Sequence, residues 1–390
     1  MDIHEHQAKE LLSENGVAIP RGALAATPEE AQAVAQAIGG ERWMVKAQIH
    51  SGSRGKAGLI RLCRSVQEVA ATSRELLGRE VTTAQSGPES KSVGKVYIEE
   101  AADVAHEVYL AFMLNRSREC VTVMASARGG ADIEESVSAD GDALVEMDLE
   151  SGTTLHAFQA RALASALGVR GAEVHGAAKA ILGCERVFRV YDLAMLEINP
   201  LACTAEGRVL ALDAKISCDD NALFRQPRIA AMRDRSQENL RESHASDQGL
   251  SYVGLDGTIG CIINGAGLAM ATMDMIRLSG GEAANFLDIG GGASPERVAR
   301  AFELVLADSR VKAVLVNIFA GINRCDWIAE GVAQAMRAQQ VQLPVILRLS
   351  GTHVEAGRKI VAASGLPIEL ADTLHDAART AVSAANDPRQ

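Results

Sequence analysis

Short apolar runs, each followed by a helical pattern, organise the second part of the chain. The five runs are residues 259–263, 284–288, 313–317, 344–347 and 367–370. Continuous apolar strands that alternate with helices predict a parallel sheet covered on both faces. Five strands are the number in a flavodoxin-like doubly wound sheet of order 2-1-3-4-5, whose crevice opens between the loops after the first and third strands. The pattern therefore predicts an α/β domain with a site at that edge.

The first part of the chain has a less regular pattern. Capping signals at residues 27–30 and 65–68 predict two helices. Alternating or continuous β-forming residues predict strands at about 96–101, 107–114 and 119–126. Runs of strands interrupted by helices favour α+β packing.

A polar and charged segment, residues 233–248, separates the two patterns, and we predict that it is a linker between domains. A chain of 390 residues exceeds the size at which a single hydrophobic core stops growing, so more than one domain is expected. We place the first domain at residues 1–238 and the second at 239–390.

The composition is that of a globular protein, with 47% hydrophobic and 23% charged residues. The net charge of -11 argues against a protein that binds nucleic acid electrostatically, because neutralising phosphates needs a basic surface. The first residues are polar and charged, which predicts no secretory signal. No apolar run reaches the roughly 18 residues of a membrane span, so we expect a cytoplasmic protein without membrane partners. The seven cysteines are odd in number and scattered, which predicts buried reduced thiols.

Two acids and an amide lie on what the pattern predicts to be two short strands joined by the turn at residues 204–207. They are Glu197, Asn199 and Asp213. Across an antiparallel pair their oxygens would face one another. Such a set suits Mg²⁺, which keeps several waters and takes other oxygens from nucleotide phosphates. The alternative is a polar hairpin with a solvated acidic face.

A lysine and a basic, glycine-rich loop predict phosphate binding in the first domain. Lys46 lies in the middle of a predicted strand, and residues 51–58 form the loop. A lysine fixed by a strand can pair with phosphates, and glycines let backbone N–H groups approach phosphate oxygens. The loop does not match the Walker pattern, so the site would be of a different kind. An ordinary surface turn is the alternative.

Glycine-rich loops also follow the predicted strands of the second domain. They are residues 264–267, 290–292 and 319–323. Glycines there can expose N–H groups at helix N-termini, where anions are stabilised. The alternative is that the glycines only form the turns between strand and helix. Two such loops at a topological switch point favour an anion site.

Several motifs, in order along the chain, resemble those of the β subunits of ADP-forming succinate–CoA ligases. The motifs are residues 1–9, the Lys46 strand, residues 54–58, 197–200, 221–225 and 264–269. The resemblance extends from the first residue to about residue 380 without large insertions. Within this family the chain is most similar to the malate–CoA ligase (malate thiokinase) branch, through residues 320–327.

The resemblance implies an ATP-grasp nucleotide-binding domain at residues 1–238 and a flavodoxin-like CoA-ligase domain at 239–390. It also implies a reaction in which a histidine relays phosphate between an acyl phosphate and ADP. That histidine and most of the CoA site belong to an α subunit, so the chain would need this partner, as an αβ or α2β2 assembly. ATP or ADP is the expected nucleotide, with Mg²⁺.

The resemblance also implies roles for individual residues of this sequence. The nucleotide contacts are Lys46, Ser53, Arg54, Gly55, Glu99 and Glu107. The metal ligands are Asn199 and Asp213, and the catalytic residue is Glu197, which would orient the partner's histidine. The substrate contacts are Asn264, Gly321, Ile322 and Asn323, with a helix that starts near Ile322 and points its N-terminus at the phosphohistidine.

Two positions depart from the family pattern. Ser53 stands where glycine is common, which could stiffen the loop or add a hydroxyl donor. Asn323 stands where succinate-specific members carry an apolar residue, which favours malate over succinate as the acid. The alternative for Asn323 is a helix cap, because asparagine is a preferred N-cap residue.

Two other classes of function remain open at this point. The chain could be a self-sufficient ATP-grasp ligase that joins a carboxylate to an amine, but the second domain would then lack a purpose. It could also be a non-catalytic regulatory module. Loss of Asn199 or Asp213 would have supported that function, and both are present.

Overall fold

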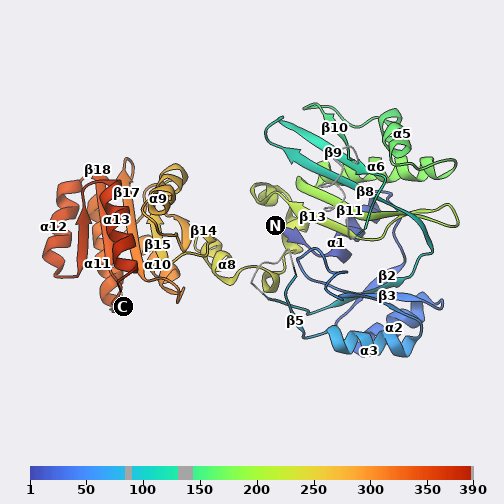
Figure 1. The fold of residues 1–390 in the computed structure, drawn as a ribbon, viewed down its shortest axis with the longest axis horizontal. Helices are drawn as coiled ribbons and strands as arrows, with labels where there is room; N and C mark the ends of the chain where they lie inside the picture. Colours follow the sequence, from blue (N-terminus) through green and yellow to red (C-terminus); the bar gives the residue numbers. More distant parts are fainter. Residues whose placement is uncertain (84–89, 131–143, 388–390) are drawn as a thin grey trace. The chain divides into compact units, whose positions relative to one another are not determined.

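The computed structural model describes residues 1–83, 90–130 and 144–387. The chain forms two compact units, Met1–Gln237 and Glu238–Gln390. The first unit contains two mixed layers of helix and sheet, and the second contains one sheet between helices (Figure 1).

A seven-stranded antiparallel sheet is the larger layer of the first unit. Its strands are β1 (Asp2–Ile3), β8 (Val104–Asn115), β9 (Cys120–Ser126), β10 (Val145–Leu149), β11 (Leu193–Thr204), β12 (Val209–Ala211) and β13 (Ala214–Cys218). The order is β1-β13-β11-β8-β9-β10, with β12 paired to β11. Helices α1 (Glu5–Glu14), α5 (Ala157–Ala166) and α6 (Glu173–Val190) share one hydrophobic core with it.

A four-stranded antiparallel sheet forms the second layer of this unit. Its strands are β2 (Gly22–Ala25), β3 (Trp43–Ala47), β4 (Ile60–Cys63) and β7 (Val96–Glu100), in the order β2-β7-β3-β4. Helices α2 (Pro28–Ile38) and α3 (Val66–Leu76) cover the face turned away from the seven-stranded sheet (Figure 1). Strands β5 (Glu80–Val81) and β6 (Lys91–Ser92) pair beside it.

The capping signals in the sequence start these two helices as predicted. The Thr27 hydroxyl accepts from the Glu30 N–H at 3.1 Å, and the Ser65 hydroxyl accepts from the Glu68 N–H at 3.1 Å. Each bond satisfies an N–H group that has no partner inside the helix. The strands predicted near residues 96, 107 and 119 are also confirmed, as β7, β8 and β9.

The division between the two units falls inside the predicted linker 233–248, after Gln237, but the segment is largely helical. It follows η2 (Asp220–Arg225) and α7 (Pro227–Ala231), and it contains η3 (Arg235–Gln237) and α8 (Leu240–Asp247). Asp234 accepts from the His4 ring at 2.8 Å, and the Asn239 side chain caps α8. The polar residues of this segment lie on exposed helix faces and at helix caps. Polarity alone does not distinguish such helices from an irregular linker.

The second unit is a doubly wound sheet. Its strands are β14 (Ser251–Gly254), β15 (Ile259–Ile263), β16 (Asn285–Asp288), β17 (Ala313–Ala320), β18 (Val345–Gly351) and β19 (Ile368–Ala371). The order is β14-β16-β15-β17-β18-β19, and all neighbours are parallel except β14 and β16. The predicted five-stranded order 2-1-3-4-5 is therefore present, but the count was one short, because β14 adds an antiparallel strand at the edge.

Helices cover both faces of this sheet. One face carries α9 (Ala266–Leu278) and α13 (Leu374–Ala385), and the other carries α10 (Pro295–Leu306), α11 (Cys325–Ala338) and α12 (Val354–Ser364). The prediction that the helix after the third parallel strand starts near Ile322 is wrong by three residues, because α11 begins at Cys325 with Arg324 as its N-cap.

All seven cysteines lie in the described part of the chain, and all are buried and reduced, as predicted. Among the residues that the structure describes, no helix has the length and apolar character to cross a membrane.

Candidate functional site

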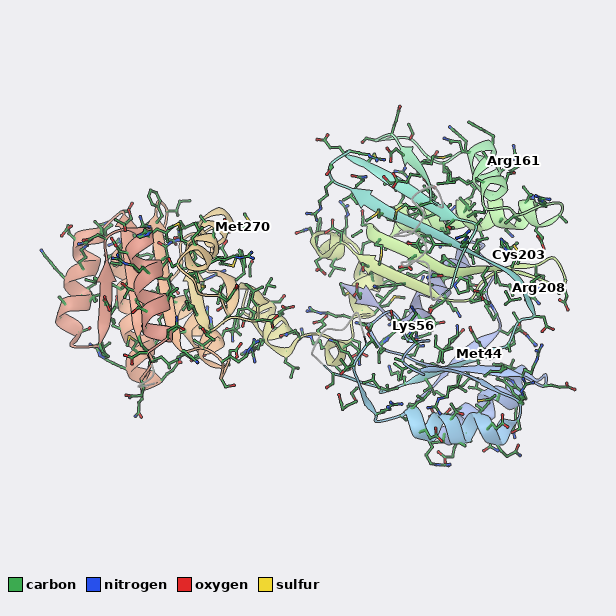
Figure 2. The ribbon with its side chains drawn as sticks, viewed as in Figure 1. Met44, Lys56, Arg161, Cys203, Arg208 and Met270 are labelled. Atoms are coloured by element: carbon green, nitrogen blue, oxygen red, sulfur yellow. The ribbon has the colours of Figure 1, made fainter. Side chains whose placement is uncertain are left out.

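A cavity of about 780 Å³ lies between the two sheets of the first unit. Strands β3, β4 and β7 supply one wall, and β8 and β11 supply the other. Met44 on β3 and Lys56 in the loop after it both line this cavity, and Figure 2 shows them between the two layers. Nine residues predicted for the nucleotide, the metal and catalysis all line it: Lys46, Ser53, Arg54, Gly55, Glu99, Glu107, Glu197, Asn199 and Asp213.

Lys46 is buried in the cavity wall, and its ammonium group lies close to three protein oxygens. Its Nζ lies 3.0 Å from Glu5 Oε1, 2.5 Å from Glu99 Oε1 and 2.5 Å from the Leu212 carbonyl oxygen. Burial alone would lower the pKa of Lys46, but the carboxylates of Glu5 and Glu99 raise it above its ordinary value. Lys46 is therefore a fixed positive charge, which is what a phosphate contact requires.

Arg54 provides a second fixed cation from the glycine-rich loop. Its Nη1 donates to the Ala47 carbonyl at 2.9 Å, and its Nη2 lies 2.6 Å from Asp213 Oδ1 and 2.8 Å from Glu5 Oε2. The neighbouring Ser53 has a φ of 56°, in the left-handed region that glycine adopts without steric cost. Ser53 thus adopts a backbone conformation that glycine would adopt without strain.

Of the two predicted metal ligands, Asn199 lies on β11, and Asp213 lies immediately before β13. The Asn199 N–H donates to the Asp213 carbonyl at 3.3 Å, so their backbones are neighbours. Asn199 Oδ1 accepts from the Gly130 N–H at 2.7 Å, and Asp213 Oδ1 accepts from Arg54 and from the Ala214 N–H. One carboxylate and one amide oxygen fit a Mg²⁺ ion that keeps its waters. In the described residues, no group of three or more His, Cys, Asp or Glu could form a richer metal site.

Glu197 lies on β11, opposite Lys215 of β13 and Ala111 of β8 in the strand register. Its side chain reaches the same cavity as Asn199 and Asp213. A carboxylate in this position can accept a hydrogen bond from an imidazole that enters the cavity.

Sequence reasoning missed two charged residues of this site, Glu5 and Lys9 on α1. Glu5 is 4% exposed and Lys9 is fully buried. Burial alone would raise the pKa of the Glu5 carboxyl, but Lys46, Lys9 and Arg54 lower it well below its ordinary value. The spacing of four residues predicts a Glu–Lys pair on one helix face. Nothing in that spacing indicates that the face is buried.

Three histidines form a second cluster beside the cavity. The His4 and His50 rings are 4.4 Å apart, and the His4 and His6 rings are 5.6 Å apart. Burial, together with the neighbouring His4, lowers the pKa of His50 to about 4. Burial also lowers the pKa values of His4 and His6. The folded protein therefore favours the neutral form of all three rings.

We expect the free energy of unfolding to decrease as the pH falls from 6.5 towards 4. Unfolded His50 takes up a proton near pH 6.5, whereas folded His50 does so only near pH 4. The stabilising contribution is complete above this window and is lost within it. Denaturant unfolding between pH 4 and 7 should show a shallower pH dependence in His50→Gln. The exposed His175 gives a matched control, His175→Gln. An unchanged slope in His50→Gln would contradict the assignment.

In the second unit, side chains join the loops at the carboxyl ends of β15, β16 and β17. We call these loops together the loop edge, which comprises residues 264–267, 288–293 and 319–324. Asn264 Nδ2 donates to the Phe319 carbonyl at 2.9 Å, and its Oδ1 accepts from the Phe319 N–H at 2.8 Å. Asp288 Oδ1 accepts from the N–H groups of Gly265 and Gly290, both at 2.7 Å. The predicted switch-point loops are therefore neighbours with a fixed geometry.

Asn323 completes the loop edge. It is 2% exposed, its Oδ1 accepts from the Ala293 N–H at 2.7 Å, and its Nδ2 donates to the Gly290 carbonyl at 2.8 Å. The alternative that Asn323 caps the helix is wrong, because Arg324 is the N-cap. A contact with a substrate hydroxyl would have to use the second N–H or the second lone pair of this amide. In contrast, the neighbouring Ile322 is 87% exposed.

Each of the two units contains a match to a known protein family. An ATP-grasp domain matches residues 2–203, and a CoA-ligase domain matches residues 262–382. The chain is 55% identical over 384 residues to a protein of Mesorhizobium japonicum named probable malate–CoA ligase subunit beta, with 98% of each chain covered.

Other relatives carry a different acid in their names. The chain is 48% identical to the subunit beta of ADP-forming succinate–CoA ligase from Acidithiobacillus ferrooxidans, over 99% of this chain and 100% of that one. It is 50% identical to the protein of the same name from Anaeromyxobacter dehalogenans, over 99% of each. Solved structures of ATP citrate lyase from Methanothrix soehngenii and Methanosaeta concilii are 19% identical over 98% of this chain and 99% of theirs, with TM-scores of 0.70 and 0.74. At that identity the likeness shows the fold alone.

Proposed function

The chain belongs to the family of β subunits of ADP-forming succinate–CoA and malate–CoA ligases, and we propose that it binds nucleotide and acid in a dicarboxylate–CoA ligase. The proposed reaction converts malate, ATP and CoA into malyl-CoA, ADP and phosphate. Succinate is the alternative acid. The observation that supports this function is the single cavity that brings together Lys46, Arg54, Asn199 and Asp213. Fixed cations and hard oxygen ligands around one cavity are the arrangement that phosphoryl transfer needs.

The chain's own residues would position and neutralise the reacting phosphates. Lys46 and Arg54 contact the phosphates, and the glycine-rich loop at Ser53 and Gly55 covers them. Glu99 and Glu107 line the remaining nucleotide pocket. Asn199 and Asp213 would hold Mg²⁺, which when bound supplies positive charge to the phosphate oxygens.

The phosphoryl group would pass through a histidine of an α partner, which also provides most of the CoA site. Glu197 accepts a hydrogen bond from one ring nitrogen and so directs the other nitrogen at the nucleotide. The partner and this chain together would form an αβ or α2β2 enzyme.

Labelled ATP tests this function directly. The chain is incubated with ATP labelled at the γ-phosphate, Mg²⁺ and the α partner, and then with CoA and either malate or succinate. Label on the partner's histidine, discharged faster by malate with CoA, is the expected result. Turnover by the chain alone would instead indicate a self-sufficient ligase, and nucleotide binding without transfer would indicate a regulatory module. Competition with GTP tests the preference for ATP.

The loop edge is our candidate for the acid site, through Asn264, Gly321, Ile322 and Asn323. We expect Asn323→Val to lower the preference for malate over succinate, measured as the ratio of kcat/KM values, by about 5- to 150-fold, because a buried polar partner of the hydroxyl is lost. The variant also leaves the Ala293 N–H and the Gly290 carbonyl without this partner. Equal losses for both acids would mean that Asn323 only positions the loop, and the malate assignment would lose this support.

A further inference from the structure

Glu5, the first residue of α1, lies between three cations at the floor of the nucleotide cavity. Its Oε1 is 3.0 Å from Lys46 Nζ and 2.9 Å from Lys9 Nζ, and its Oε2 is 2.8 Å from Arg54 Nη2. Gln48 Nε2 donates to Oε2 at 3.3 Å. This carboxylate therefore contacts both cations that we assign to the phosphates, while it comes from a different element from either of them.

Lys9 lies behind Glu5 and Glu99 and contacts both carboxylates. The cavity is lined by Glu5, Glu99 and Lys46. Within the described part of the chain, Lys9 does not line it. Lys46 contacts the same two carboxylates. Each carboxylate is thus shared between two ammonium groups, so neither has to be neutralised by Lys46 alone.

The network is balanced in charge, and all of its members except Asp213 are buried. Its three cations are Lys9, Lys46 and Arg54, and its three carboxylates are Glu5, Glu99 and Asp213. Charges that are removed from water are tolerated only when they are paired in good geometry. Removal of Lys9 would leave an excess negative charge in the wall that faces the phosphates, and removal of the Glu5 charge would leave an excess positive one.

We propose that Glu5 and Lys9 are positioning residues for the nucleotide site: Glu5 fixes Lys46 and Arg54 in place, and Lys9 compensates the carboxylates so that Lys46 keeps its charge available for phosphate. This inference rests on the proposed function in one respect, that Lys46 and Arg54 contact the nucleotide. It adds a role for α1, which carries none of the predicted phosphate or metal contacts.

Substitution of the two residues should affect nucleotide affinity differently. In the assembled enzyme, Lys9→Met is expected to weaken ADP binding about 10-fold, because an uncompensated carboxylate repels phosphate at short range. Glu5→Gln should bind ADP at least as tightly as the wild type, yet its kcat should fall about 10- to 100-fold, because Lys46 and Arg54 are no longer held in register. A purely structural role would weaken binding in both variants.

The double variant Glu5→Gln/Lys9→Met removes one charge of each sign and keeps the side-chain volumes. It should fold, bind ADP within about threefold of the wild type, and retain the low kcat of Glu5→Gln, since the charge is restored but the positioning is not. If either single variant fails to fold, the kcat of the double variant still tests the positioning role. The matched control is Glu10→Gln on the same helix, where the side chain is 55% exposed and pairs with Arg228. This control should leave both constants unchanged.

Calorimetric titration with ADP and steady-state kinetics give the two readouts. A double variant with normal kcat would overturn the proposal, as would equal weakening of ADP binding in both single variants. Lys46→Met separates this result from a failure of the proposed function. If Lys46→Met does not weaken ADP binding, the nucleotide assignment is wrong; if it does but Glu5 and Lys9 variants behave as the wild type, only the positioning role is wrong.

Discussion

Replacement of Asp213 by alanine is expected to abolish phosphorylation of the partner's histidine while the two subunits still assemble. The Asp213 carboxylate is the only charged oxygen in the proposed metal pair, and a bound metal stabilises the transferring phosphate by several kcal/mol, or about 10³-fold or more in rate. The substitution also takes from Arg54 one of its two carboxylate partners. Two measurements check this: transfer of label from ATP, and the affinity for Mg²⁺ or Mn²⁺ measured by titration.

A surface aspartate provides the control for this substitution. Asp372 is 79% exposed and pairs with Arg358 at 2.7 Å, so Asp372→Ala changes the same charge away from the cavity. It should transfer label at the wild-type rate. If Asp213→Ala retained normal turnover and metal affinity at ordinary Mg²⁺ concentrations, the metal assignment would be wrong.

Glu197→Gln is expected to slow phosphoryl exchange between the partner's histidine and ADP by about 10²- to 10⁴-fold, the usual range for a positioned acid–base partner. Nucleotide affinity should not change, because Glu197 is not among the predicted phosphate contacts. Glutamine keeps the size of the side chain but removes the charge that stabilises and orients an imidazole. Rapid-quench measurement of labelled phosphohistidine, with ADP added at different concentrations, separates the rate of transfer from binding.

A glutamate on an exposed strand serves as the control for Glu197. Glu146 on β10 is 44% exposed and pairs with Arg118 at 3.0 Å. Glu146→Gln should exchange phosphate normally. Equal exchange in wild type and Glu197→Gln would remove Glu197 from the mechanism.

The parallel sheet of the second unit was predictable because its central strands β15 and β17 are mainly apolar and buried almost throughout, whereas the edge strand β19 is buried only at Ala371. The edge strand β14 was missed because it is four residues long and only Tyr252 is buried. Its presence is decided by pairing with β16, which is a tertiary contact. The late start of α11 has a similar cause, since Asn323 is held in the loop by Ala293 and Gly290 rather than at the helix end.

The candidate site shows the same division between local and tertiary information. Strand and loop signals predicted that Lys46 and Arg54 belong to one site, and the hairpin signal predicted that Asn199 lies near Asp213; all four line the same cavity. Glu5 was not predicted, because a charged residue at a helix start is normally exposed. Its burial follows from the cations that other elements bring to it, and no local pattern contains them.

The bonds across the loop edge also have a thermodynamic consequence. Asn264, Asp288 and Asn323 fix three glycine-containing loops through their backbone groups when the unit folds. The conformational entropy of those loops is therefore lost at folding and not at the moment a ligand arrives. Glycine at this edge gives a ligand close access to the backbone, while the neighbouring amides and carboxylate provide rigidity. An anion that docks there meets a surface that is already ordered.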